Sequence, residues 1–176
     1  MKTALLIVDV QNYQVMNSVN SDIVCDKVRE TLDFFRKSGL SIFHIRHTSA
    51  DAQDNLSFEK SIHDSATPAS GEPLIEKRFP NAFKNTDLLD RLIAGGIQRI
   101  VVCGMFSNMC VEATVRAGVD FGFKCVVLHD ACSAMPITFN GSEIPGEVVH
   151  RSTMATLNMF GGIYADLKSV EEFING

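Results

Sequence analysis

The hydrophobic residues of this chain gather into short runs separated by amphipathic stretches. The run at 3–10, with the sequence TALLIVDV, is nearly continuous and is typical of a parallel strand covered on both faces. Comparable runs predict five further strands, at 41–46, 74–77, 99–103, 124–128 and 162–166. Six strands are therefore expected.

Helical spacing fills most of the intervals between these runs. From about Ser21, apolar residues recur every three or four positions up to Phe35, and Gly39 stands where a helix would end. Similar patterns predict helices at 86–96, 110–121, 147–160 and from 169 onward. Strands that alternate with helices predict an α/β fold: a doubly wound, mostly parallel, Rossmann-like sheet with right-handed crossovers.

Length and charge narrow the class of protein. A chain of 176 residues with 45% hydrophobic and 21% charged residues suits one globular domain, 1–176. A net charge of -5 without a basic stripe argues against nucleic-acid binding. The first ten apolar residues are too short to span a membrane and lack a small-residue cleavage site, so neither membrane association nor a signal peptide is expected. Five cysteines without a CxxC spacing suit a reducing cytoplasm.

Three residues stand where α/β proteins place their chemistry, at the carboxyl ends of strands. Asp9 closes the first predicted strand, Lys77 closes the third, and Cys110 opens the helix after the fourth. Each also has an ordinary interpretation, as a helix cap, a solvated lysine and an inert core thiol respectively. Together they favour a reactive Cys110, because a helix N-terminus and a nearby ammonium both stabilise a thiolate. Cys132, in a predicted loop, is the reserve candidate.

Five segments in order resemble the isochorismatase-like cysteine hydrolases, the superfamily of isochorismatase, nicotinamidase and N-carbamoylsarcosine amidohydrolase: LLIVDVQN, EKRFPNAF, GMFSNMCVEATVRAG, VVLHDACSA and VVHRSTMATL. The resemblance implies a three-layer α/β/α fold. It also implies a triad in which Cys110 is the nucleophile, Asp9 the general base and later acid, and Lys77 the group that balances charge. A cis bond between Met105 and Phe106 is implied as well, with the backbone N–H groups of Phe106 and Cys110 as the oxyanion hole.

The match departs from the metal-dependent nicotinamidases. The segment IFHIRHTSADAQ lacks their Asp-x-His spacing, although His44, His47 and the later His63 are present. Such histidines are more often satisfied side chains than ligands, so no metal and no other cofactor is expected. A pocket lined by Gln11, Tyr13, Phe83 and Phe106 is expected, with core packing an equal alternative for Phe83.

These features predict a cysteine-dependent hydrolase that cleaves a small amide, carbamoyl or related acyl substrate through a thioester. Two alternatives stay open: hydrolysis of a vinyl ether C–O bond, as in isochorismatases, and a catalytically silent α/β binding or scaffold protein. Specificity is expected to depend on the long 48–73 segment and the 133–146 loop. The expected partners are a small-molecule substrate and further copies of the chain, in a homodimer or larger homo-oligomer.

Overall fold

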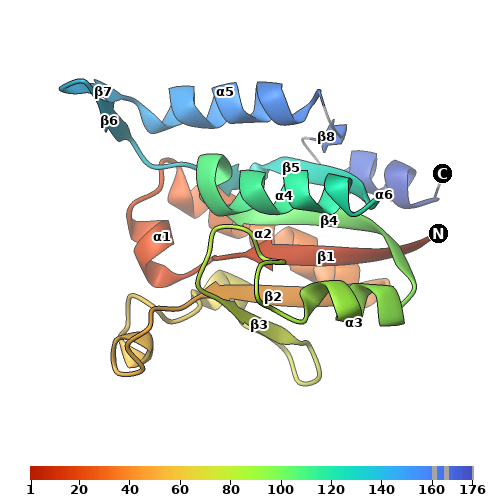
Figure 1. The fold of residues 1–176 in the computed structure, drawn as a ribbon. Helices are drawn as coiled ribbons and strands as arrows, with labels where there is room; N and C mark the ends of the chain where they lie inside the picture. The colour runs from red at the N-terminus through yellow and green to blue at the C-terminus, as the bar shows by residue number, and fades with distance from the viewer. Residues whose placement is uncertain (160–161, 165–166, 176) are drawn as a thin grey trace.

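The computed structural model describes residues 1–159, 162–164 and 167–175 and contains one six-stranded sheet (Figure 1). The strand order is β3-β2-β1-β4-β5-β8, and every neighbouring pair is parallel. These strands are β1 (Lys2–Val8), β2 (Ser41–His47), β3 (Leu74–Lys77), β4 (Ile97–Met105), β5 (Lys124–Ser133) and β8 (Gly162–Tyr164). The prediction of a six-stranded, doubly wound parallel sheet is confirmed.

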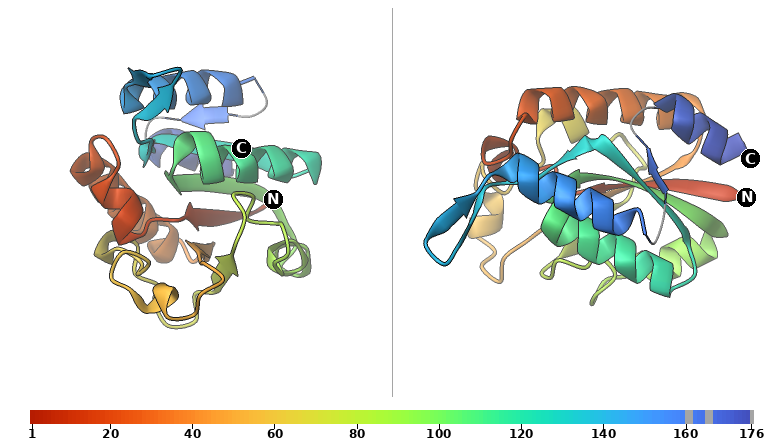
Figure 2. Two further views of the ribbon diagram at one scale, coloured as in Figure 1. Left: turned by 60° about the vertical axis from the view of Figure 1, so that its left-hand side comes forward. Right: turned by 90° about the horizontal axis from the view of Figure 1, so that it is seen from above.

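Helices cover both faces of the sheet, which gives the molecule three layers (Figure 2). One face carries α2 (Ser21–Lys37) and α6 (Leu167–Asn175). The opposite face carries α3 (Leu88–Ala94), α4 (Glu112–Asp120) and α5 (Gly146–Leu157). No helix within the described residues is long and apolar enough to cross a membrane.

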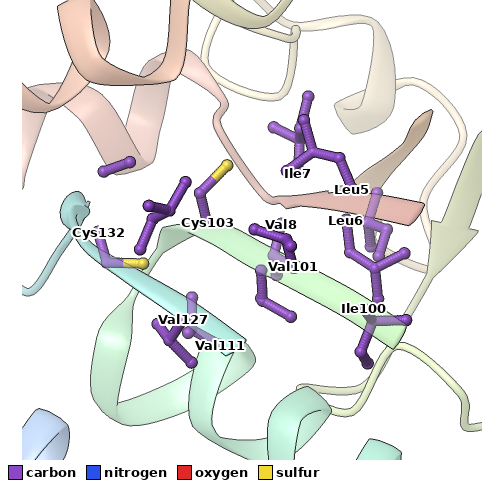
Figure 3. Close-up of a cluster of buried hydrophobic side chains, with 14 of the residues drawn as sticks. Leu5, Leu6, Ile7, Val8, Ile100, Val101, Cys103, Val111, Val127 and Cys132 are labelled. Atoms are coloured by element: carbon purple, nitrogen blue, oxygen red, sulfur yellow. The ribbon is translucent and has the colours of Figure 1, made fainter. Parts of the chain in front are cut away.

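The hydrophobic core is centred on β1 and β4, which lie side by side in the middle of the sheet (Figure 3). Their side chains alternate between the two faces, and both faces are covered by helices, so the two strands need apolar residues at successive positions. This explains why LLIV in β1 and IVVC in β4 read as unbroken apolar runs. The labelled residues, each at most 3% exposed, are Leu5, Leu6, Ile7, Val8, Ile100, Val101, Cys103, Val111, Val127 and Cys132.

Some short elements were not predicted. The helix α1 (Asn12–Met16) and the turns η1 (Asp54–Leu56) and η2 (Asp64–Ala66) are each about one turn long, too short to show a hydrophobic period. The predicted loop 133–146 contains an antiparallel hairpin of β6 (Ile137–Phe139) and β7 (Ser142–Ile144). Its turn residues, Asn140 and Gly141, both have positive φ, so the Asn-Gly pair was a readable hairpin signal.

Several boundaries also differ from prediction. β4 extends to Met105 and β5 to Ser133, beyond their predicted runs, because backbone pairing continues through Gly104 with Cys132 and Met105 with Ser133. The helix predicted at 147–160 ends at Leu157. The predicted ends at residues 160 and 166 lie outside the described residues.

Candidate active site

Three strand ends converge at one edge of the sheet, beside α1 (Figure 1). Asp9 directly follows β1, and Lys77 is the last residue of β3. Cys110 lies in the turn after β4, which pairs with the other side of β1. Because parallel strands end at the same edge, the sheet order brings together residues that are far apart in sequence.

Asp9 and Lys77 form a fully buried ion pair. The Lys77 Nζ donates to Asp9 Oδ2 at 2.6 Å, and both side chains are 0% exposed. Burial raises the pKa of Asp9, while the Lys77 charge and then the Cys110 thiol oppose the rise. Asp9 also has a φ of 51°, a left-handed conformation that aspartate tolerates better than most residues. The carboxylate is thus held next to a cation, and both side chains are shielded from bulk solvent.

The chain after β4 makes a tight turn that presents Cys110. The peptide bond between Met105 and Phe106 is cis, as the resemblance implied. A π-helical turn, η3 (Ser107–Val111), follows, and α4 begins only at Glu112. Cys110 therefore lies in this π turn and does not itself open an α-helix, which corrects the sequence prediction.

The hydrogen bonds of this turn indicate which N–H groups can face a substrate. Met109 and Val111 donate their backbone N–H groups to the Phe106 carbonyl, at 3.0 and 3.2 Å, so these donors are already used. The Ser107 hydroxyl donates to the Ser133 carbonyl at 3.0 Å and lies 2.7 Å from His150 Nδ1. These bonds fix the turn against β5 and α5.

Gly104 permits the close approach of β1 and β4 just before the turn. Its φ is +123°, and a Cβ atom at this position would lie 2.0 Å from the Val8 carbonyl oxygen. Only glycine fits here without moving one backbone away from the other. The distance between the ends of β1 and β4, and hence between Asp9 and Cys110, depends on this residue.

The surroundings of Cys110 favour the protonated form of its thiol. Burial, and secondarily the Asp9 charge, raise its pKa to about 12, against the opposing effect of Lys77. The expectation that the helix N-terminus and ammonium would favour a thiolate is therefore wrong, because desolvation and the neighbouring carboxylate outweigh both. Asp9 is placed to act on the proton, since its carboxylate and the Cys110 thiol are within 4.8 Å of each other and share a side-chain hydrogen bond that contributes to both pKa shifts.

A cavity of about 630 Å³ opens over Cys110. Tyr13 and Phe106, two of the four predicted pocket residues, line it. Phe83 does not: it is buried and packs against Phe121 and Phe123, with ring centroids 5.2 and 6.2 Å away. Phe83 is therefore a core residue, the second of the two alternatives that the sequence left open.

Gln11, the fourth predicted pocket residue, is fully buried and does not line the cavity either. Its side-chain oxygen accepts from the His47 backbone N–H at 2.8 Å. Its Nε2 donates to the carbonyls of His47 and Lys60, at 3.1 and 2.7 Å. Gln11 thus fastens two neighbouring segments of the pocket wall, and all its polar atoms are used in doing so.

Another cavity is larger, about 860 Å³, and lies between α2, β5 and α5. The cysteine in its wall is Cys132, the reserve nucleophile, which is buried, with burial raising its pKa to about 12. Asp9 and Lys77 line neither cavity, but their charges act on the Cys110 thiol and are not among the causes of the Cys132 pKa shift. The smaller cavity is the better candidate active site because a thiol there has both a base and a cation beside it.

The predicted histidines have different surroundings. His44 is buried and donates from Nε2 to Glu72 at 2.7 Å, and His63 contacts Ser65 at 2.9 Å. His47 lines the cavity, and one of its ring nitrogens lies within 4.8 Å of both Asp9 and Cys110. These three groups have the chemistry of a metal site, but the Lys77 ammonium already contacts Asp9 and lies 3.3 Å from His47 Nδ1. A divalent cation would have to compete with it.

Lys60 also lines the cavity, and sequence reasoning missed it as a site residue. It lies in the long polar segment whose importance was predicted only as a whole. No hydrophobic periodicity distinguishes one lysine in such a segment from another. Lys60 can be recognised only from the structure, in which its backbone carbonyl accepts a hydrogen bond from Gln11.

Comparison with known proteins agrees with this architecture. Residues 3–141 match the isochorismatase domain. An uncharacterized isochorismatase family protein of Bacillus subtilis, YddQ, is 36% identical over 99% of both chains. A streptothricin hydrolase of Streptomyces noursei is 33% identical over 73% of this chain, which spans about half (48%) of that relative. A crystal structure of a Pseudomonas putida isochorismatase has a TM-score of 0.87 and 32% identity, covering 92% of this chain and 86% of that one. The chain belongs to the isochorismatase family of hydrolases.

Proposed function

We propose that this hydrolase cleaves the acyl C–N bond of a small amide or carbamoyl compound through a thioester on Cys110. The cluster of Asp9, Lys77 and Cys110 carries this proposal, because it places a base and a fixed cation behind a thiol that lines the cavity. A thiol is the nucleophile suited to covalent acyl transfer. The raised pKa of Asp9 suits a group that must both accept and return a proton.

The first half of the reaction forms the thioester. As Cys110 Sγ attacks the carbonyl carbon, its proton moves to the Asp9 carboxylate, so a free thiolate is never needed. The backbone N–H groups of Phe106 and Cys110 receive the developing oxyanion. The C–N bond then breaks, and Asp9 returns the proton to the departing nitrogen. Lys77 keeps the carboxylate oriented and balances its charge throughout.

The second half releases the acyl group. Water attacks the thioester carbonyl and loses a proton to Asp9, the C–S bond breaks, and that proton returns to the sulfur. One water is consumed and the thiol is restored. The same oxyanion donors serve both steps, which lowers the number of groups that the site must hold in place.

The test is a panel of small amides, ureido acids and esters followed by intact-mass spectrometry. We expect an acyl adduct on the wild-type protein, located at Cys110, and a rate at least about a thousandfold lower for Cys110→Ala. Activity should withstand a chelator. A vinyl ether needs only protonation, for which sulfur is dispensable. Turnover that survives in Cys110→Ala without an adduct would therefore replace this proposal with C–O hydrolysis.

A further inference from the structure

The charged residues around the cavity leave one cation in excess. The charges of Asp9 and Lys77 cancel at 2.6 Å, and those of Glu112 and Arg116 cancel at 2.7 Å. Lys60 has a much longer ion pair, 3.9 Å, with Asp54, whose side chain is 45% exposed. Such a distant, solvated pair is weak. The cavity wall therefore has a net positive charge at Lys60.

A neutral hydrogen-bond donor, on His47, lines the same cavity. Lys77 Nζ is 3.3 Å from His47 Nδ1, and an ammonium can only donate, so Nδ1 accepts. The hydrogen of the neutral ring is then on Nε2, at the opposite edge of the imidazole. Burial, then the Lys77 charge, lower the pKa of His47, which favours the neutral ring.

Gln11 fixes the backbones of the two residues that carry these groups, before any ligand arrives. Through its side-chain amide it bonds the backbone of His47 twice and the backbone of Lys60 once. The Gln11 backbone also pairs with Ile62, which ties the 48–73 segment to the sheet edge. The Lys60 charge further contributes to the lowered pKa of His47, so the two groups are electrostatically close. A backbone that is already fixed reduces the entropy that the site loses when it binds a ligand.

We infer that the Lys60 ammonium and the His47 Nε2–H bind a carboxylate of the substrate, which is then a small amide or ureido acid. This rests on the proposed function for the acyl end of the molecule. One charged and one neutral donor match the two oxygens of a carboxylate, and a charge-assisted hydrogen bond is the stronger kind. A cavity of about 630 Å³ limits the ligand to metabolite size. Lys60 and His47 thereby become determinants of specificity.

Binding to Cys110→Ala tests the inference without turnover. The probes are N-carbamoylglycine and its primary amide, which differ only in the carboxylate, measured by isothermal titration calorimetry. We expect the acid to bind about tenfold tighter or more. Adding Lys60→Met should abolish that preference. Adding Lys37→Met, at an exposed position on α2, should keep it.

His47 needs a variant that separates its hydrogen bond from its packing. His47→Gln retains a side-chain N–H and should keep part of the preference for the acid, whereas His47→Ala should lose it. Equal binding of acid and amide by the Cys110→Ala protein would overturn the inference, even if the wild type forms a thioester. A preference for the acid together with no acyl adduct on any substrate would refute the proposed reaction and leave the carboxylate site intact.

Discussion

The carboxylate of Asp9 has two opposite effects on the neighbouring thiol. It is the proposed acceptor of the Cys110 proton, yet its charge is the second-largest reason why the pKa of that thiol reaches about 12. Asp9→Asn keeps a residue that tolerates positive φ, and it leaves the Lys77 charge unbalanced next to the sulfur. The variant should therefore have a lower thiol pKa and lack a base.

For Asp9→Asn we expect faster alkylation of Cys110 by iodoacetamide at pH 7.5, together with a loss of turnover of at least about a hundredfold. Mass spectrometry of peptides would give both the rate and the site. Cys110 is half-buried in the cavity wall and the other four cysteines are buried, so they serve as internal controls. Slower alkylation in the variant would mean that Asp9 promotes a thiolate in the resting protein.

Lys77 should be a large contributor to stability for the same reason. Lys77→Met removes the partner of a fully buried carboxylate, which costs about 3–5 kcal/mol when the charge is left unpaired. Urea denaturation would measure the loss. The double variant Asp9→Asn/Lys77→Met removes both charges and should recover most of it. If the single variant were as stable as the wild type, the ion pair would not be a structural element.

The sequence was enough to identify the reactive residues of the site and their positions, but not the surroundings of their side chains. Asp9, Lys77 and Cys110 could be singled out because each closes a predicted strand or lies in the turn that follows one. The role of Gln11 could not, because its partners lie 36 and 49 residues away. The direction in which the Cys110 pKa shifts also could not be predicted, since it depends on how far the effect of burial outweighs that of the nearby cation.

At the scale of elements, the contact between β1 and β4 tolerates no side chain at Gly104. Gly104→Ala would place a methyl group 2.0 Å from the Val8 carbonyl, and its φ of +123° adds strain. Because the clash is with backbone, we expect Gly104→Ala to lower the free energy of unfolding by more than about 3 kcal/mol, or the variant to fail to accumulate as folded protein. Gly122→Ala is the control: its φ is +87° but nothing lies within 4 Å, so about 1 kcal/mol is expected. Equal urea midpoints for both variants would contradict this.

Glu72, in the segment before β3, forms hydrogen bonds with α2 and with β2. Their contribution to stability should depend on pH. Arg36 of α2 donates twice to its carboxylate at 2.8 Å, and His44 of β2 donates at 2.7 Å. Chiefly through the Arg36 hydrogen bonds, the pKa falls from 4.5 to about 2. The folded pKa is below the unfolded one, so the ionised group stabilises the protein above pH 4.5, and the effect disappears as pH falls toward 2.

Glu72→Gln should accordingly lower the free energy of unfolding at pH 7 by roughly 3 kcal/mol at most, and by progressively less in acid. Urea unfolding at pH 7, 4.5 and 3 would follow the trend. Glu76→Gln, which alters a pair with Arg46 at a carboxylate that is 52% exposed, should change stability by under about 1 kcal/mol. A Glu72→Gln effect that is constant across this range would exclude a pKa origin.

Elements were predictable where they are long and covered on both faces. β1, β2 and the helix α2 appear close to their predicted bounds because burial imposes an unbroken run or a clear helical period. The π turn around Cys110 has no such signal. Its geometry depends on Ser107 bonding to β5 and α5, contacts that form only when the layers assemble.

At the scale of the whole molecule, the strand order places the earliest strand in the middle. β1 pairs with β2 on one side and with β4 on the other. β4 comes only after β2, β3 and α3 along the chain. The family model covers all of these elements and extends to residue 141.

This order has a consequence for protein synthesis. At a synthesis rate of about 5–20 residues per second, one edge of the apolar β1 stays unpaired for several seconds before β4 has been synthesised. An exposed apolar strand edge is a template for misassociation. Ribosome-bound chains that stop before Ile97 should be digested readily by protease and retained by chaperones, whereas chains that expose β4 and β5 should become resistant. Resistance already present in the shorter chains would show that β1, β2 and β3 can fold on their own.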